Sequence, residues 1–173
     1  MRVVGGTARG RKLKAPPGSG TRPITDRAKE AIFNMLAART NLVGITVADL
    51  FAGSGSFGIE ALSRGAAHVT FVERNREAAR VLAGNLDALG FSDRADLIVA
   101  PVDTALRRLE PVDLVFCDPP YADDPWLDLL GRLEADLLVG HAETPVALTD
   151  RWEEITRRAY GRAQIVIARR VER

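Results

Sequence analysis

The sequence predicts an α/β domain built on a mostly parallel sheet, and three observations support that fold class. Short apolar runs alternate with amphipathic segments from residue 45 onwards. Two of the amphipathic segments are followed by glycines, Gly65 and Gly90, at positions that typically end helices. The last two strand-like runs have no helix between them. Alternation of this kind gives right-handed βαβ units, so we expect seven strands, parallel except for one C-terminal antiparallel strand.

The first 25 residues differ in texture from the rest. Glycines and prolines, including Pro16-Pro17-Gly18, break any helical pattern there into short extended or turn segments. We therefore expect a basic N-terminal arm or hairpin over residues 1–25 and the α/β domain over residues 26–173. A helix is predicted from Asp26 to about Ala38, with Thr25 or Asp26 as its N-cap.

The remaining elements follow in order along the chain. Predicted strands cover residues 45–51, 68–73, 95–100, 113–118, 144–150, 157–161 and 163–170. Predicted helices between them cover residues 57–64, 75–89, 104–109 and about 125–139.

Length and composition exclude several protein classes. With 173 residues, 46% of them apolar and 27% charged, the chain has the composition of one ordinary globular domain. The single cysteine, Cys117, rules out an intrachain disulfide and a cysteine-cluster metal site, and we expect no metal. No apolar run approaches the roughly 18 residues of a membrane span, and the start of the chain lacks the apolar segment of a secretory signal. We therefore expect a cytoplasmic protein.

The net charge of +1 conceals a strong asymmetry. Residues 1–29 contain eight basic side chains and one acidic side chain, a charge of +7, whereas the other 144 residues contain 16 basic and 22 acidic ones, a charge of −6. Such segregation indicates that the front of the chain meets a polyanion, although a basic stretch can also serve only for solubility.

A glycine-rich segment after the first strand carries the strongest local signal. Gly53, Gly55 and Gly58 satisfy the pattern G-x-G-x-x-G, and Glu73 follows at the end of the second strand. The glycines allow backbone amides to approach a ligand, and a carboxylate after strand two suits a ribose diol. The pattern predicts an adenosine-containing cofactor, and both NAD and S-adenosylmethionine fit it.

Two acids refine this prediction. Asp49 lies at the tip of the first strand, where a carboxylate suits a cationic amino-acid group and would sit badly beside a pyrophosphate. It favours S-adenosylmethionine as the cofactor. Asp103, after the third strand, is placed to accept a hydrogen bond from an adenine amine, to cap the helix over residues 104–109, or to do both.

The second decisive motif is Asp118-Pro119-Pro120-Tyr121, directly after a buried strand. Ligands of such sheets bind outside the carboxyl ends of the strands, so this motif falls beside the glycine loop. The prolines fix φ and remove two backbone donors. Asp118 and the Pro119 carbonyl can then accept the two hydrogens of an exocyclic base amine, while Tyr121 offers a face on which a base stacks.

At these residues the chain resembles a known group, the amino-methyltransferases with a Rossmann-like fold that use S-adenosylmethionine. More narrowly, R-G-R-K-L followed by R-P-x-T-D-R-x-x-E-x-x-F-N resembles the N-terminal signature of the RsmD family. That family methylates the exocyclic N2 of a guanine in bacterial 16S ribosomal RNA. The resemblance implies a cofactor loop at Asp49, Phe51, Gly53, Ser54 and Gly55. It also implies that Glu73 holds the ribose, that Asp103 lies beside the adenine, and that Asp118–Tyr121 form the catalytic loop.

From this resemblance and the charge pattern we expect a methyltransferase domain whose basic arm binds ribosomal RNA. The expected partner is 16S ribosomal RNA, free or within an assembling small subunit, and the expected state is a monomer. The basic side chains assigned to RNA binding are Arg9, Arg11, Lys12, Lys14, Arg22 and Arg27.

Three alternatives stay open at this point. The same motif serves methylation of a DNA adenine or cytosine amine, although the short chain has no separate region for reading DNA. The glycine loop also fits an NAD-dependent oxidoreductase, and the fold fits an RNA-binding module without catalysis. His68 and His141 are interpreted as surface or strand-end residues, because nothing in the sequence pairs them.

Overall fold

A computed structural model of the chain describes residues 1–17, 24–120 and 126–171. Two residues of the predicted sites, Arg22 and Tyr121, lie outside this part. Within it, no helix has both the length and the apolar character needed to cross a bilayer.

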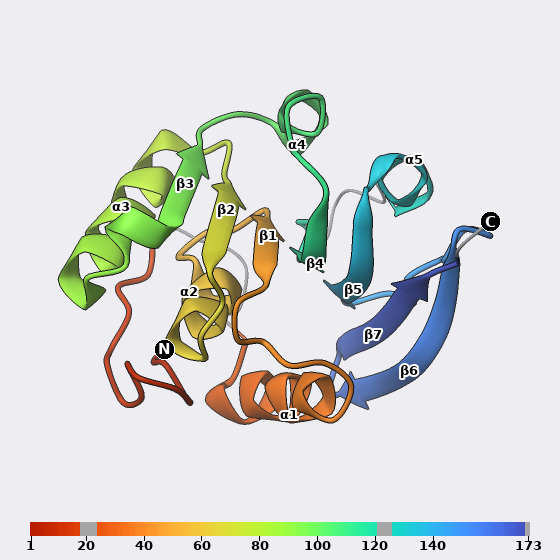
Figure 1. Ribbon diagram of the computed structural model, residues 1–173, viewed down its shortest axis with the longest axis horizontal. Coiled ribbons are helices and arrows are strands. Elements are labelled where there is room, and N and C mark those ends of the chain that lie inside the picture. Colours follow the sequence, from red (N-terminus) through yellow and green to blue (C-terminus); the bar gives the residue numbers. More distant parts are fainter. Residues whose placement is uncertain (18–23, 121–125, 172–173) are drawn as a thin grey trace.

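One seven-stranded sheet forms the centre of the molecule (Figure 1). Its strands are β1 (Thr46–Leu50), β2 (His68–Val72), β3 (Ala95–Ile98), β4 (Val112–Cys117), β5 (Ala135–Ala142), β6 (Trp152–Tyr160) and β7 (Ala163–Arg170). Their order across the sheet is β3-β2-β1-β4-β5-β7-β6, and β7 runs antiparallel to both of its neighbours. The prediction of a mostly parallel sheet with one C-terminal antiparallel strand, β7, is therefore confirmed.

Helices cover both faces of the sheet, as Figure 1 shows. They are α1 (Asp26–Ala37), α2 (Ser56–Ser63), α3 (Arg76–Leu89), α4 (Val102–Ala105) and α5 (Trp126–Arg132), with a short 3-10 helix over Ser92–Arg94. The first three helices pack on one face in a core that includes Phe33, Leu62 and Leu82. The other two pack on the opposite face, where Ala105 and Leu130 are buried.

The region between residues 125 and 150 differs from the prediction. The predicted helix over about 125–139 stops at Arg132, and β5 begins three residues later. No strand forms over residues 144–150, where the fifth strand was expected. The run that forms β5 is buried on both faces of the sheet, and a continuous apolar run of this kind cannot be told from a buried helix by periodicity.

Helix α4 also differs from the predicted helix over residues 104–109. It begins earlier, because Pro101, whose φ is −57°, is the N-cap residue. Asp103 therefore lies inside the first turn of α4, and its predicted role as N-cap is wrong. Thr25, in contrast, caps α1, because its side chain accepts a hydrogen bond from the backbone N–H of Ala28.

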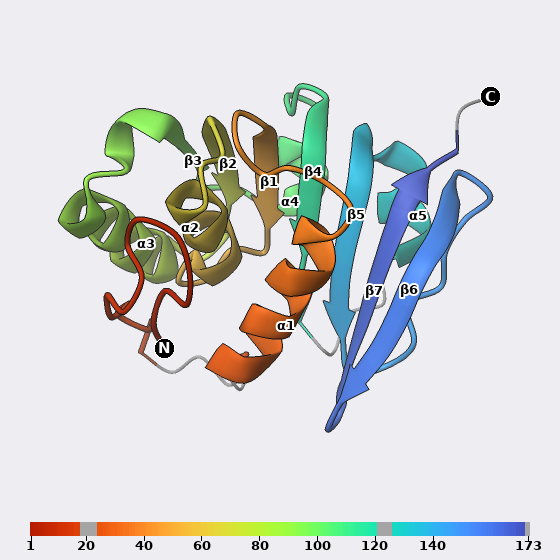
Figure 2. The same ribbon diagram turned by 60° about the horizontal axis from the view of Figure 1, so that its bottom comes forward.

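The first residues of the chain form a hairpin that packs on the domain. Arg2 and Lys12 form an antiparallel bridge, and the backbone N–H of Val3 donates to the carbonyl of Arg11. Val3 and Leu13 are buried in the core shared with α1, α2 and α3. Figure 2 shows this segment lying against α2 and α3. The basic segment is thus anchored at its apolar positions.

Candidate active site

The glycine loop between β1 and α2 is held by a buried carboxylate. Asp49 is only 2% exposed, and its Oδ2 accepts a hydrogen bond of 2.8 Å from the backbone N–H of Gly58. Phe51, directly after β1, has a φ of +61°, which is uncommon for a bulky residue. Such backbone strain persists only where the surroundings enforce it, as they often do at ligand sites.

Glu73 closes the loop from the end of β2. Its Oε2 accepts from the N–H of Gly53 and its Oε1 from the N–H of Asn75, each at 2.8 Å. Each carboxylate oxygen has a second lone pair, so the side chain can still accept bonds from two adjacent hydroxyl groups. A methyl group built on Gly53 would meet nothing within 4 Å, so there is open space at this loop position. This arrangement suits a ribose.

Gly55 and Gly58 differ from Gly53, because both are closely packed against neighbouring side chains. A Cβ atom on Gly55 would lie 2.1 Å from the Leu82 side chain, and one on Gly58 would lie 2.3 Å from the Phe71 ring. Gly55 also has a φ of +80°. The glycines therefore let α2 approach the sheet and α3, which places the loop at the carboxyl ends of the strands.

Three carboxylates at this edge create a negative site. Burial raises the pKa of Asp49 well above its usual range, and the charges of Asp118 and Glu73 raise that pKa further. The hydrogen bond from Gly58 opposes the shift. A cationic ligand would relieve the repulsion. The residues therefore fit a ligand that carries a ribose and a positive charge, as S-adenosylmethionine does.

The loop after β4 lies beside this edge. Strand β4 pairs with β1 so that Cys117 is level with Leu50, and the N–H of Asp118 donates to the Leu50 carbonyl at 3.5 Å. The Asp118 side chain is 35% exposed, whereas Pro119 is buried. Asp49 in β1 and Asp118 directly after β4 thus lie on neighbouring strands, as predicted. The side chain of Cys117 is buried in the core on the face of the sheet that α4 and α5 cover.

A histidine that the sequence analysis interpreted as a surface or strand-end residue belongs to this site. His141 near the end of β5 is buried, and its Nδ1 lies 2.7 Å from Oδ1 of Asp118. No local pattern signals this pairing, because the two residues come from different strands and only the sheet order brings them together. His68, in contrast, lies at the amino end of β2, 2.9 Å from Asp96.

Asp103 lies in α4, and its hydrogen bonds within the described part of the chain do not join it to the three carboxylates. Its Oδ1 accepts from Nη1 of Arg132 at 3.0 Å, and Arg132 also binds the Asp103 carbonyl. The Asp103 side chain is largely exposed. Its contact with an adenine stays a prediction.

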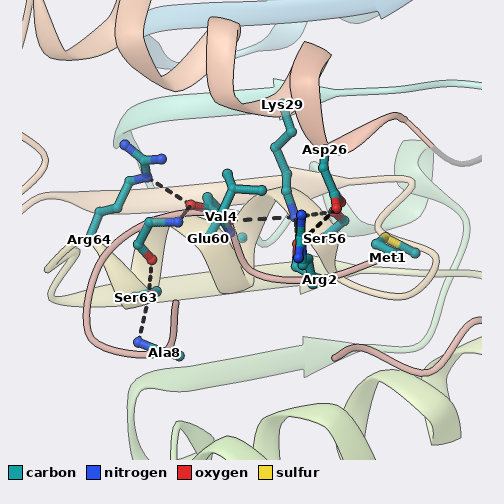
Figure 3. A network of polar contacts seen from close by, with 12 residues as sticks. Met1, Arg2, Val4, Ala8, Asp26, Lys29, Ser56, Glu60, Ser63 and Arg64 are labelled. Atoms are coloured by element: carbon teal, nitrogen blue, oxygen red, sulfur yellow. Dashed lines mark hydrogen bonds and ion pairs between the residues drawn. The ribbon is translucent and has the colours of Figure 1, made fainter. Parts of the chain in front are cut away.

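A buried polar network joins the hairpin to α1 and α2 (Figure 3). Glu60 of α2 is fully buried and accepts from the backbone N–H groups of Val4 and Gly5, at 2.9 and 2.7 Å. Lys29 of α1, also fully buried, donates to the Arg2 carbonyl at 2.6 Å and lies 3.5 Å from Oε2 of Glu60. These bonds fix the hairpin on the domain.

The cofactor loop touches the same hairpin. Asn85 of α3 donates to the carbonyls of Lys14 and Ser54, at 3.0 and 3.1 Å, and accepts from the N–H of Lys14. The Ser54 hydroxyl lies 3.5 Å from the Met1 sulfur. Loop and hairpin are therefore parts of one packed unit.

The basic residues assigned to RNA are exposed wherever the structure describes them. Within the hairpin they are Arg9, Arg11, Lys12 and Lys14, and in the first turn of α1 there is Arg27. Arg11 also donates from Nη2 to the Ala88 carbonyl. Lys29, which belongs to the same basic segment of the sequence, is buried against Glu60 and cannot contribute its charge to that surface.

Together, fold and site define a class of α/β domain that binds an adenosine-containing cofactor at the carboxyl edge of its sheet, beside an Asp-Pro-Pro loop. Comparison with known families then places the chain. Residues 1–169 match the family described as "Conserved hypothetical protein 95", and the chain belongs to that family.

Curated relatives support the same placement. The chain is 38% identical over 159 residues to the Bacillus subtilis protein named "Putative rRNA methyltransferase YlbH", in a match that covers 90% of this chain and 85% of the relative. It is 40% identical over 121 residues to ribosomal RNA small subunit methyltransferase D of Escherichia coli K12. That match spans 70% of this chain and 60% of the relative. The resemblance to the RsmD family is thereby confirmed.

Solved structures agree with the fold. The Escherichia coli protein yhhF has a TM-score of 0.86 and 32% identity, with 98% of this chain and 97% of that chain covered. A hypothetical protein of a Thermus species has a TM-score of 0.80 at the same identity, with 96% and 98% covered.

Proposed function

We propose that this protein transfers a methyl group from S-adenosylmethionine to the exocyclic N2 amine of a guanine in 16S ribosomal RNA. The observation that carries the proposal is the meeting of two motifs on adjacent strands. Asp118 follows β4 directly beside β1, whose end carries Asp49 and the glycine loop. An acceptor loop for a base amine and a glycine loop suited to a cationic adenosine cofactor thus share one edge. The relatives that bear ribosomal RNA methyltransferase names support this substrate.

In this site the chain's own residues bind the cofactor and orient the base amine. S-adenosylmethionine supplies an electrophilic methyl group on a positively charged sulfur. Glu73 holds the ribose and Asp49 faces the positive charge, while Asp118 and the Pro119 carbonyl accept the two amine hydrogens and aim the nitrogen lone pair. Catalysis then depends on positioning, for which a well-oriented pair of reactants can recover roughly 7–11 kcal/mol of the barrier. The target base must leave its stack to reach this edge, and stacking on Tyr121 stays a prediction.

RNA binding is assigned to the exposed face of the hairpin. Phosphate contacts from its arginines and lysines supply affinity without reading sequence. Because the hairpin is fixed to α1, α2 and the cofactor loop, RNA held there has a defined position relative to Asp118. We expect the protein to act as a monomer in the cytoplasm, on naked 16S RNA or on an assembling small subunit.

Incubation of the protein with tritiated S-adenosylmethionine and 16S RNA, naked and within assembled subunits, tests the proposed function. We expect label in RNA, and analysis of the labelled nucleoside to give N2-methylguanosine. In a parallel reaction with duplex DNA, label in an adenine or cytosine would favour the DNA-methylating alternative. RNA binding without methyl transfer would indicate a non-catalytic RNA-binding module. Reduction of NAD, added in a third reaction, would indicate an oxidoreductase.

Neutralising the hairpin is expected to weaken RNA binding. In the quadruple variant Arg9→Gln, Arg11→Gln, Lys12→Gln and Lys14→Gln, affinity for 16S RNA falls and its dependence on salt flattens. Each lost phosphate contact lowers the slope of log K against log salt by about 0.7 to 0.9. Filter binding over a salt series measures the slope. An unchanged slope would mean that the hairpin does not contact the RNA backbone. Arg107→Gln and Arg108→Gln, exposed just after α4, serve as the control for general charge loss.

Cofactor affinity is expected to rise with pH through the titration of Asp49. Its pKa in the free protein is raised, chiefly by burial, so below that pKa the site is protonated and lacks the charge that a cation needs. Binding of a cation then releases a proton, and affinity increases until the carboxyl is ionised in the free protein. Isothermal titration in buffers of different ionisation enthalpy counts the protons released. Proton release that persists in Asp49→Asn would assign it to another group.

A further inference from the structure

Two strands bring an imidazole against the carboxylate of the catalytic loop. His141 Nδ1 and Asp118 Oδ1 are 2.7 Å apart, which is a short distance for a nitrogen–oxygen hydrogen bond. Strand β5, which carries His141, pairs with β4 so that Gly140 is level with Cys117. The contact is therefore set by sheet register and not by a loop.

The chemistry of the pair fixes which atom carries the proton. An ionised carboxylate only accepts hydrogen bonds, so His141 must donate from Nδ1. This bond occupies Oδ1 of Asp118 and leaves Oδ2 available. The His141 side chain is 5% exposed and that of Asp118 35%, so the imidazole lies behind the carboxylate, and only the carboxylate is substantially open to a substrate.

Aromatic packing holds the imidazole in place. The ring of Phe57 in α2 meets that of His141 edge-on, with centroids 6.3 Å apart and planes at 61°. Phe57 is itself stacked on Phe116 of β4, at 5.1 Å and 12°. The helix that follows the cofactor loop therefore also supports the histidine.

Among the described residues, few charged side chains lie near His141. Asp118 from the end of β4 is ionisable, whereas Phe57 of α2 and Ile165, its register partner in β7, are not. Two more distant charges lie on neighbouring strands. Asp49 on β1 interacts with Asp118, and Arg158 in β6 is level with Ile165.

We infer that His141 is a positioning residue for methyl transfer: it holds Asp118 through the Nδ1–H···Oδ1 bond and keeps Oδ2 directed at the base amine. The inference rests on the proposed function. In the transfer, the amine nitrogen bonds to the methyl carbon while the carbon–sulfur bond breaks and leaves its electron pair on sulfur. The amine, now cationic, loses one proton to Asp118 Oδ2, and that proton passes on to water.

Two variants test whether the hydrogen bond from His141 positions Asp118. His141→Leu removes the bond, and we expect kcat to fall by about 10²-fold, as for a misplaced catalytic group, with KM for RNA within about twofold. His141→Asn places an amide donor near the position of Nδ1, and we expect it to recover part of kcat.

The matched control is His68→Gln, because His68 also contacts an aspartate but at the opposite edge of the sheet. We expect its kcat to equal that of the wild type. A kcat of His141→Leu within about threefold of the wild type would overturn the inference, as would a kcat of His141→Asn no higher than that of His141→Leu. A loss of S-adenosylhomocysteine affinity equal to the loss of kcat would show a merely structural role. A wild type without transfer would instead refute the proposed function.

A readout independent of turnover is the imidazole proton itself. The chain has two histidines, so His68→Gln assigns the nitrogen-15 resonances of His141 directly. We expect a hydrogen-bonded Nδ1 proton in the wild type that shifts or disappears in Asp118→Ala. An Nδ1 resonance without an attached proton at neutral pH, or one unaffected by Asp118→Ala, would contradict the pairing.

Discussion

Replacing Asp118 by alanine is expected to lower methyl transfer by on the order of 10³-fold while cofactor affinity stays within about twofold. In the proposed site the variant removes one of the two acceptors of the base amine, so the nitrogen lone pair is no longer aimed at the methyl group. The cofactor contacts proposed for Asp49 and Glu73 come from other strands and would remain. Single-turnover rates with labelled cofactor and isothermal titration of S-adenosylhomocysteine measure the two effects separately.

Asp118→Asn refines the same test. An amide keeps one acceptor oxygen but neither the charge nor the capacity to take a proton, so its rate should lie between those of the wild type and the alanine variant. Asp93→Ala, an exposed acid in the 3-10 helix before β3, should behave as the wild type does. If the alanine variant lost cofactor affinity as much as rate, Asp118 would belong to the cofactor site.

The placement of the candidate cofactor residues at one edge of the sheet was predictable because their signal is local. Asp49, the glycines and Glu73 lie within one βαβ unit, where the order strand, loop, helix, strand fixes their relative places. The structure also shows a role of these side chains within the protein itself. Asp49 and Glu73 each accept a backbone N–H of the glycine loop, so the acids also shape the loop.

His141 was not predictable for the opposite reason. Its partner Asp118 is 23 positions away, and their contact requires β5 to lie beside β4. The sequence predicts a helix over part of β5, since a strand buried on both faces shows no alternation. Because a helix is predicted where β5 forms, the sequence does not place His141 beside Asp118.

The charge pattern predicted the exposed face of the hairpin but not its attachment. Counting Lys29 with the basic segment treats its charge as available, although burial lowers its pKa and Glu60 is its partner. Arg2 is likewise paired, with Asp26 at 2.8 Å. The sequence shows where charged residues lie along the chain, whereas only the packed structure shows which of them are exposed to solvent.

Glu60→Ala is expected to lower the free energy of unfolding by about 3–5 kcal/mol, the usual result of removing one member of a buried ion pair. The backbone N–H groups of Val4 and Gly5 lose their acceptor, and the buried ammonium of Lys29 loses its opposite charge. Burial already lowers the pKa of Lys29, and Glu60 opposes that shift, so the variant should favour the neutral amine. Urea denaturation followed by circular dichroism measures the change.

The double variant Glu60→Leu with Lys29→Met distinguishes charge from packing. It replaces the pair by apolar side chains of similar volume, so part of the stability lost in Glu60→Ala should return, because no buried Lys29 ammonium is left without its opposite charge. Arg64, whose Nε lies 2.8 Å from Oε1 of Glu60, still loses its ion pair. The hairpin would still lack the acceptor for Val4 and Gly5. RNA affinity should therefore recover less than stability, if a fixed hairpin is what holds the RNA near Asp118. A Glu60→Ala variant within about 1 kcal/mol of the wild type would show that the network does not anchor the hairpin.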